Sequence, residues 1–354
     1  GMTANPRQPP VALARAGAAP IAAPIVAVDW LKAIASQLIV WHHLALYGPM
    51  SDAVQPHAPA LVGWLVEHAR IAVQVFLVVA GFLAAHSLLG RAGPLPVARL
   101  VWQRYLRLAR PYLVALVLAV AAAALARALI AHPTIPAAPT AAQFAAHALL
   151  LHDIAGVDAL SAGVWYIAID VQLYAVFVVL LALAQGRAAP ALALVAALAV
   201  ASLFWFNRDA SLDRWALYFY GAYGLGVGAW WASRHSRRAA WAVALAAVVL
   251  LALTLDWRSR IALAGATALL LVVAAELRVP ENRVVAWAAR ISYPLFLVHY
   301  PVALVVGAVV HRLWPAHAAA NAAGLVLAWL ASLIAAVALH RATEPATARR
   351  RDAA

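Results

Sequence analysis

Cysteine is absent from this sequence of 354 residues. The chain therefore has no disulfide, no thiol nucleophile and no cysteine-ligated metal site, and a covalent intermediate would have to form on His, Ser, Thr or Lys. Lysine is almost absent as well, because Lys32 is the only one. Nearly all of the positive charge consequently belongs to arginine.

Charge of either sign is scarce, since charged residues make up 11% of the chain and hydrophobic residues 66%. The mean hydropathy of +0.86 is higher than the surface of a soluble domain tolerates. A formal net charge of +13 could suit nucleic acid, but the arginines stand in short clusters between apolar runs and form no continuous basic face. We therefore predict an all-α, polytopic integral membrane protein whose surroundings are the lipid bilayer, with no nucleic-acid partner.

Apolar runs long enough to cross a bilayer predict about ten transmembrane helices. When the connections alternate between the two sides, about eighteen basic residues fall on one side and about seven on the other. This asymmetry predicts that the N- and C-termini are both cytoplasmic. The predicted spans are 29–48, 69–89, 109–131, 164–184, 188–206, 212–232, 239–255, 259–276, 291–311 and 320–340.

The chain divides into three predicted regions. Residues 1–24, rich in Pro and Ala, form a disordered cytoplasmic tail with no cleaved signal peptide, residues 25–345 form the membrane domain, and residues 346–354 form a short basic cytoplasmic tail. The one long outer loop, 132–163, is either a cover over an outward-facing site or a structural cap. The run GAYGLGVG at 221–228 is typical of close helix packing.

The first predicted helix carries polar groups that a simple anchor would not need. Asp29, Lys32, Ser36 and His43 lie within or beside it, and ionisable groups inside a bilayer are costly unless they have a partner or a function. Lys32 and His43 lie within roughly 20° of the same helix face and about 16 Å apart along its axis. We predict a polar track along this face, with Ser36 on it.

Asp170, in the fourth predicted span, would lie at about the same depth as His43, given a rise of about 1.5 Å per residue. A carboxylate that orients an imidazole makes histidine a competent general base, so Asp170 is a candidate partner of His43. The alternative is that each of the two has a separate packing partner.

Arginines repeat every third residue at the cytoplasmic entrance of the third span, at Arg104, Arg107 and Arg110. They share one broad helix face and could bind phosphate through bidentate hydrogen bonds. The competing interpretation is that they set topology or bind anionic lipid. His299, in the ninth span, is interpreted as a histidine bonded to a neighbouring helix rather than a catalytic one.

Six short motifs stand in order along the chain. They are Asp29, Lys32 and His43; Phe76, Gly81 and Phe82; Arg104 and Arg107; Trp165, Gln172 and Tyr174; Ser292, Tyr293, His299 and Pro301; and Glu344 with Pro345. Together they resemble acyltransferase family 3, a family of integral membrane enzymes that includes bacterial O-acetyltransferases of cell-surface polysaccharides, and the resemblance covers the chain from Asp29 to Pro345. Three positions depart from the family pattern: lysine stands at 32 where arginine is commoner, alanine at 80 where serine is usual, and aspartate at 170 where glutamate is usual.

The resemblance implies an O-acyltransferase of the bacterial inner membrane that uses cytoplasmic acyl-CoA, most simply acetyl-CoA, as a co-substrate and holds no permanent cofactor and no metal. Arg104, Arg107 and Arg110 would then bind CoA phosphates, and His43 would act as general base or transient acyl carrier. Asp170 would orient His43, and Lys32 would neutralise donor phosphate or the thioester oxygen. The remaining motif residues would bind substrate or support the structure: Asp29, Ser36, Trp165, Tyr174, Ser292, Tyr293, His299 and Glu344.

The acceptor implied is a hydroxyl of an extracytoplasmic or lipid-linked glycan. A lipid head group or a small hydroxylated molecule remains an alternative acceptor. The residues themselves also permit a different class of protein, a proton-coupled transporter, because lysine, histidine and aspartate within membrane helices serve equally well as a proton relay.

Overall fold

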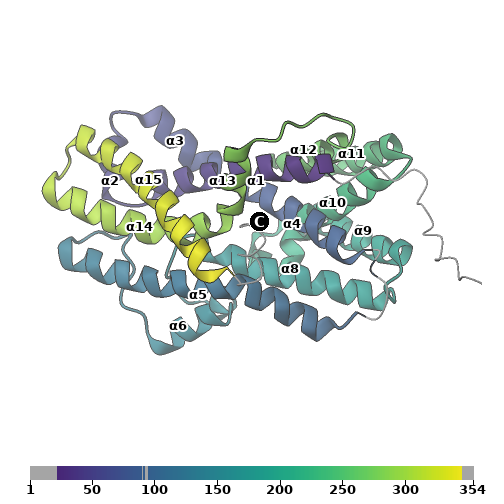
Figure 1. The fold of residues 1–354 in the computed structure, drawn as a ribbon, viewed down its shortest axis with the longest axis horizontal. Coiled ribbons are helices and arrows are strands. Elements are labelled where there is room, and N and C mark those ends of the chain that lie inside the picture. Colours follow the sequence, from purple (N-terminus) through teal and green to yellow (C-terminus); the bar gives the residue numbers. More distant parts are fainter. Residues whose placement is uncertain (1–21, 90, 92–94, 345–354) are drawn as a thin grey trace, which may run out of the picture.

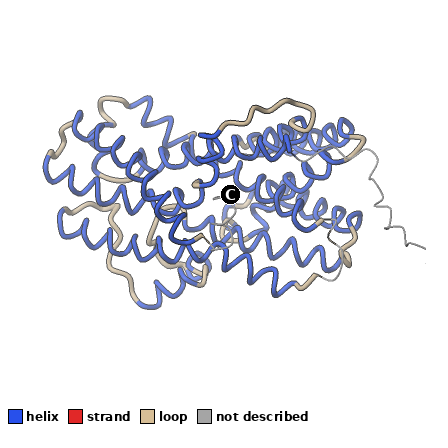
Figure 2. The backbone as a smooth tube through the Cα atoms, viewed as in Figure 1, coloured by secondary structure: helices blue, strands red, loops and turns tan. Residues whose placement is uncertain are grey.

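The computed structural model describes residues 22–89, 91 and 95–344, and all regular structure within them is helical (Figure 1, Figure 2). The predicted all-α fold is confirmed. The predicted terminal tails lie outside the described residues, except that residues 22–24 belong to the first helix.

Helix α1 (Ala22–Leu46) runs between two groups of helices, which occupy the left and right halves of Figure 1. The left group contains α2 (Pro49–Val54), α3 (Pro59–Glu67), α14 (Ser292–Leu313), α15 (Ala318–Thr343) and most of the long helix α5 (Val97–Leu129). The right group contains α4 (Val73–Leu88), α8 (Val164–Leu183), α9 (Ala188–Phe204), α10 (Ala216–Arg234), α11 (Arg238–Leu255) and α12 (Ser259–Val273). Short helices join them: α6 (Ala141–Ala148), α7 (His152–Ala155), α13 (Arg283–Arg290), and the 3₁₀ turns Ala69–Ala72, Phe206–Arg208 and Ala210–Leu212.

Each group has its own apolar core, and α1 contributes to both. Ala35 and Ile39 are buried with the helices of the right group, whereas Val40 and Leu44 are buried with those of the left group. The polar side chains of α1 therefore lie where the two groups meet.

Among the described residues, eight helical segments are long and apolar enough to cross a membrane. The two other predicted spans, 212–232 and 259–276, correspond to α10 and α12. Helix α12 has 15 residues, and the Gly, Tyr and Trp residues of α10 make it less apolar than the eight. The span predicted at 109–131 marks only the apolar part of α5, which begins at Val97. The helix extends further because the arginine-rich turns before residue 109 are also good helix formers.

Helices α4 and α10 touch backbone to backbone, as the glycine-rich run predicted. A Cβ atom on Gly81 would overlap the carbonyl oxygen of Tyr223, and one on Gly226 would overlap that of Val78. The tightest contact in the run is thus at Gly226, while Gly224 packs against Ala199 of α9. Gly81, a motif residue, has a packing role because any side chain there would separate the two helices.

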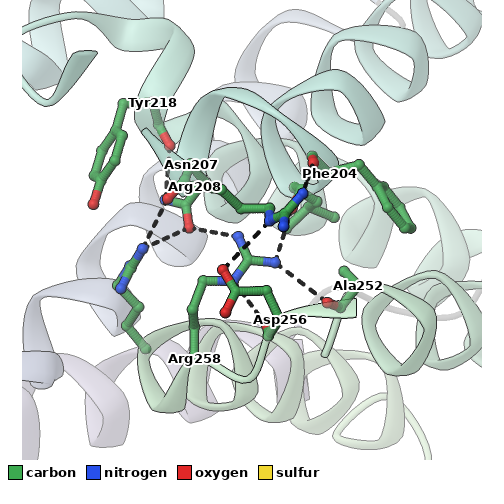
Figure 3. Close-up of polar contacts among 9 residues, drawn as sticks. Phe204, Asn207, Arg208, Tyr218, Ala252, Asp256 and Arg258 are labelled. Atoms are coloured by element: carbon green, nitrogen blue, oxygen red, sulfur yellow. Dashed lines mark hydrogen bonds and ion pairs between the residues drawn. The ribbon is translucent and has the colours of Figure 1, made fainter. Parts of the chain in front are cut away.

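A buried arginine hydrogen-bonds to carbonyl groups near the ends of α9 and α11 (Figure 3). Arg258, which is 5% exposed, donates hydrogen bonds to the carbonyl oxygens of Leu203 at 2.8 Å and Ala252 at 3.4 Å, and to Asn207 Oδ1 at 2.8 Å. Asn207 Nδ2 in turn donates to the carbonyl oxygen of Tyr218 at 2.9 Å. The Leu203 carbonyl lies in the last turn of α9, where carbonyl groups lack an intrahelical partner, whereas that of Ala252 also accepts from Asp256 N at 3.1 Å. Arg258, at the N-cap of α12, thus holds α9, α11 and α12 together in addition to any effect on topology.

The long loop between α5 and α8 contains α6, capped by the Thr140 side chain, which accepts a hydrogen bond from Gln143 N at 3.0 Å. Two tyrosines of α5 hold this region, since the Tyr105 and Tyr112 hydroxyls donate to the carbonyl oxygens of Ala148 at 2.8 Å and His147 at 2.9 Å. The part of the loop from Thr140 to Ala148 therefore has a structural role, as one of the two predicted alternatives requires, while Thr134 and Ile135 line the pocket that contains His43, as the other requires.

We predict that Gly226→Ala lowers the free energy of unfolding in detergent by about 1–3 kcal/mol or more, because the added methyl group forces α4 and α10 apart. Gly63→Ala on α3 is the matched control, since a Cβ atom there meets no atom within 4 Å. Thermal unfolding of the two purified variants measures the difference. Equal stability of Gly226→Ala and Gly63→Ala would contradict the close contact.

Candidate functional site

A cavity of about 1080 Å³ lies between the two helix groups. We call it the inner cavity; its walls come from α1, α4, α5, α8, α14 and the last turn of α15. Basic side chains outnumber acidic ones on these walls. The charged side chains lining the cavity are Lys32, Arg91, Arg104, Arg107, Arg110 and Arg290 on the positive side, and Asp170 and Glu344 on the negative side, with His340 beside them.

Asp170 of α8 and Arg104 of α5 form a bidentate ion pair in this cavity. Arg104 Nε donates to Asp170 Oδ1 at 2.9 Å and Arg104 Nη2 donates to Oδ2 at 2.9 Å. The carboxylate is 5% exposed, and the guanidinium also lies over the ring of Tyr174 at 5.7 Å from its centroid. Two parallel charge-assisted hydrogen bonds fix both side chains, so both carboxylate oxygens of Asp170 are occupied by Arg104.

Three other predicted cations remain available to a ligand. Lys32, Arg107 and Arg110 line the inner cavity, and none of them forms a hydrogen bond or ion pair with a described residue. Asp29 lies close enough to Lys32 and Arg290 to interact with their charges. A cavity lined by cations that have no hydrogen-bond or ion-pair partner is suited to a ligand that carries several negative charges.

Several motif residues support the wall of the inner cavity. Ser292 Oγ donates to the carbonyl oxygen of Ala289 at 2.7 Å, and the Tyr293 hydroxyl donates to that of Leu108 at 2.8 Å, so Tyr293 ties α14 to α5. Both residues line the inner cavity, as do Tyr174 and Glu344. The hydrogen bonds that Ser292 and Tyr293 donate to backbone carbonyls give these two residues a structural role in the cavity wall.

His43 lies in a second, smaller pocket, which we call the outer pocket. It is lined by α1, α14 and the segment that follows α5, including Tyr47, Thr134, His299 and Tyr300. His43 Nδ1 lies 2.8 Å from His299 Nε2, and the two imidazole rings are stacked with centroids 4.9 Å apart and planes 9° apart. The interpretation of His299 as bonded to a neighbouring helix is supported, and the neighbour is His43 itself.

The hydrogen bonds of the pair fix its protonation pattern when both rings are neutral. His299 Nδ1 lies 3.1 Å from the carbonyl oxygen of Leu295, which can only accept, so this nitrogen carries the proton. His299 Nε2 is then an acceptor, and His43 Nδ1 must donate to it. The lone pair of His43 is consequently on Nε2, to which no described residue hydrogen-bonds.

This geometry corrects the predicted pairing of His43 with Asp170 and agrees with the alternative, in which each of the two has a separate packing partner. The two residues were placed at similar depth, but depth along separate helices does not determine which helices are neighbours. In the structure, Asp170 forms an ion pair with Arg104, and His43 hydrogen-bonds to His299. An imidazole, held by a backbone carbonyl, stands where the carboxylate was expected.

Three further predicted site residues, Asp29, Ser36 and Trp165, line neither hollow, and the motif residue Gln172 lines neither of them. Ser36 is 2% exposed, and its Oγ donates to the carbonyl oxygen of Ala33 at 3.0 Å. Its hydroxyl is therefore hydrogen-bonded within α1 and is not part of the polar track. Trp165 stacks on Phe219 of α10 at 5.4 Å. Gln172 accepts from Ala216 N at 2.8 Å and thereby fixes the start of α10. Their contacts indicate structural roles.

The inner cavity and the outer pocket are separated by about one helical turn. On α14, Phe296 lines the inner cavity and His299 lines the outer pocket, and three residues of helix span about 4.5 Å. On α1 the corresponding residues are Ile39 and His43, about 6 Å apart along the axis. A group at the end of one hollow could therefore react with a group in the other without crossing a long channel.

The sequence did not point to Tyr166 or Phe296, whereas Tyr47 lies near the polar face predicted for the first helix. Tyr47 stacks on His43 at 5.8 Å, and Tyr166 and Phe296 meet edge to face at 5.9 Å in the wall between the hollows. Aromatic residues are common in apolar helices, so composition gives Tyr166 and Phe296 no distinguishing signal. His299 had two signals, its imidazole within a membrane span and its place in a motif shared with a known family.

Comparison with known proteins supports one family. A family model described as an acyltransferase domain matches residues 25–341, which include both hollows and nearly all of their lining residues. No curated protein and no solved structure matches the chain.

We predict that Asp170→Asn lowers the free energy of unfolding by about 3 kcal/mol, because it leaves Arg104 without its counter-charge in a largely buried position. Replacing both partners with apolar residues, Arg104→Met with Asp170→Leu, should recover part of this loss. Unfolding of the detergent-solubilised variants is the measurement.

The control for this prediction is Glu276→Gln, which breaks the exposed Arg238–Glu276 pair, 2.7 Å long. That change should cost about 1 kcal/mol or less. A loss for Asp170→Asn no larger than that for Glu276→Gln would show that the buried pair does not stabilise the fold.

Proposed function

Since the chain belongs to acyltransferase family 3, we propose that this membrane acyltransferase moves an acyl group from cytoplasmic acyl-CoA to a hydroxyl of an extracytoplasmic or lipid-linked glycan. The observation that carries the proposal is the one-turn separation between a large cationic cavity and a pocket that contains a histidine with a free Nε2 lone pair. The donor occupies the inner cavity, and the acceptor presents one hydroxyl to the outer pocket, whose volume of about 20 Å³ admits a group the size of a water molecule.

The inner cavity suits CoA in charge and in size. Its volume of about 1080 Å³ is at the upper end of the range of about 300–1,000 Å³ that is usual for small-molecule sites, as a large nucleotide thioester requires. Lys32, Arg107 and Arg110 supply unpaired positive charge for its phosphates. Arg104 is held by Asp170, so it positions the surrounding cavity wall rather than serving only as a phosphate ligand.

His43 acts as the general base. Its Nε2 takes the proton of the acceptor hydroxyl as the oxygen attacks the thioester carbonyl, and His299 holds the tautomer that leaves Nε2 free. The carbon–sulfur bond then breaks, an ester bond has formed to the acceptor oxygen, and the proton passes from His43 to the departing CoA thiolate. The carboxylate of Asp170 takes no part in this proton transfer.

The outer pocket offers an aromatic surface beside the base. Tyr47 is 37% exposed, stacks on His43 and meets the edge of Tyr300 at 5.6 Å. An aromatic ring with a polar hydroxyl fits a ligand that has both apolar faces and hydroxyl groups. A sugar is such a ligand, and a hydroxyl placed over Tyr47 would be next to His43.

We predict that His43→Ala reduces transfer of labelled acetyl from acetyl-CoA into the membrane glycan fraction by about 10²–10⁴-fold, the usual contribution of a general base. His299→Ala should lower kcat more than it raises KM for acetyl-CoA, because it removes the acceptor of the His43 Nδ1 proton without altering the inner cavity. His299→Gln, which keeps an acceptor oxygen, should restore part of the rate.

The neighbouring His42 provides the control, since its Nδ1 bonds to the carbonyl oxygen of Leu65 at 2.9 Å rather than to His299. His42→Gln should keep most of the activity. Undiminished transfer by folded His43→Ala would refute the assignment of the base, and solute flux without consumption of acetyl-CoA would favour a transporter.

We predict that Arg107→Ala raises the KM for acetyl-CoA by about 10- to 100-fold, as loss of a charge-assisted hydrogen bond to phosphate implies. Arg107→Lys should retain part of the affinity because it keeps the charge and loses the bidentate geometry. Arg187→Ala is the control, because Arg187 is exposed and does not line the inner cavity. An unchanged KM in Arg107→Ala would favour the competing interpretation, in which the arginine cluster sets topology or binds anionic lipid.

A further inference from the structure

Phe296 occupies the wall between the two hollows, and its ring is held on several sides. It meets the ring of Tyr166 edge to face at 5.9 Å, and the ring of His299 lies 6.1 Å away. On a third side lies the backbone of Gly163 at the start of α8. A Cβ atom added to Gly163 would lie 2.6 Å from Phe296 Cζ, so this side leaves the ring no room to move.

The same glycine places Phe296 beside the proposed base. The Cβ position of Gly163 lies 3.5 Å from His43 Cε1 as well as 2.6 Å from Phe296 Cζ. Phe296 and His43 therefore both border the open side of Gly163, and both rings lie against the ring of His299. In the proposed reaction, an acyl carbon within reach of a hydroxyl at His43 lies beside Phe296.

Behind Phe296 lies a small, mainly apolar void of about 10 Å³, just below or at the size that holds one water molecule. Its walls include Ala115 and Leu116 of α5 and Ala162 before α8. Phe296 and Ile167 line both this void and the inner cavity. The phenyl ring thus closes a space into which the cavity would otherwise extend.

We propose that Phe296 is the specificity-determining residue that restricts the donor to short acyl groups, by blocking the apolar void into which a longer acyl tail would extend. This inference rests on the proposed function and deepens it, because it names the class of acyl group transferred. A methyl group next to the thioester carbonyl fits against the ring face. Each further methylene needs space that the ring and the backbone of Gly163 occupy.

Truncation of the ring should convert the void into an acyl pocket. In Phe296→Ala the void joins the inner cavity, and the space vacated by the phenyl ring, added to the void of about 10 Å³, makes room for an alkyl chain. Since one methylene in an apolar pocket changes discrimination by about tenfold or more, the preference for acetyl over butyryl should fall by at least that factor.

The experiment uses membrane vesicles from cells that produce the full chain, supplied with radiolabelled acetyl-, propionyl- or butyryl-CoA. Initial rates of label incorporation into the membrane glycan and lipid fractions give the ratio of butyryl to acetyl transfer. We expect the wild type to favour acetyl and Phe296→Ala to raise the ratio about tenfold or more.

Phe76→Ala is the matched control, because Phe76 also lines the inner cavity and contacts Tyr166 at 6.3 Å but does not line the void. Its ratio of butyryl to acetyl transfer should stay close to that of the wild type. Phe296→Leu, which keeps most of the apolar volume, decides the matter if Phe296→Ala fails to fold, and should raise the propionyl ratio more than the butyryl ratio.

The outcomes separate the two proposals. If the wild type transfers no acyl group from any of the three thioesters, the proposed function fails. If it transfers acetyl but the folded Phe296 variants keep the wild-type ratio, or Phe76→Ala shifts the ratio as much as they do, the role of Phe296 is overturned and the acyltransferase stands.

Discussion

An ionisable side chain inside an apolar helix bundle needs a counter-charge, a hydrogen-bond partner or a water-filled space, because a bare charge in a low-dielectric surrounding is very costly. The chain meets this requirement in all three ways. Asp170 and Arg104 neutralise each other through two bonds of 2.9 Å. Arg258 is surrounded by oxygen acceptors at helix ends. Lys32 and Arg107, which have no such partner among the described residues, line a cavity of about 1080 Å³.

The same requirement explains why the molecule is hollow between its two helix groups. Each group has an apolar core of its own, and the cationic residues of α1 and α5 cannot enter either core. They collect where the groups meet, and a hollow lined by positive charge results. In the proposed function this hollow provides what a phosphate-rich donor needs, and binding of that donor would offset the cost of the charges.

The histidine pair lies on the other side of a thin wall. Helices α1 and α14 both pass through that wall, and each changes from lining one hollow to lining the other within about one turn. Two substrates can thus approach from opposite ends and meet at one place. The aromatic side chains of Tyr166 and Phe296 fill the wall, so the wall itself can select what reaches His43.

The sequence by itself determined the helical membrane fold, since runs of apolar residues leave a chain no alternative to helices in lipid. It also identified Lys32, Arg107 and His43 as polar groups that needed an explanation, because their cost does not depend on which helices are neighbours. The tertiary structure alone decided the partners. Asp170 and His43 were paired by depth, yet packing brings Arg104 and His299 to them, because depth along each helix does not determine which helices become neighbours.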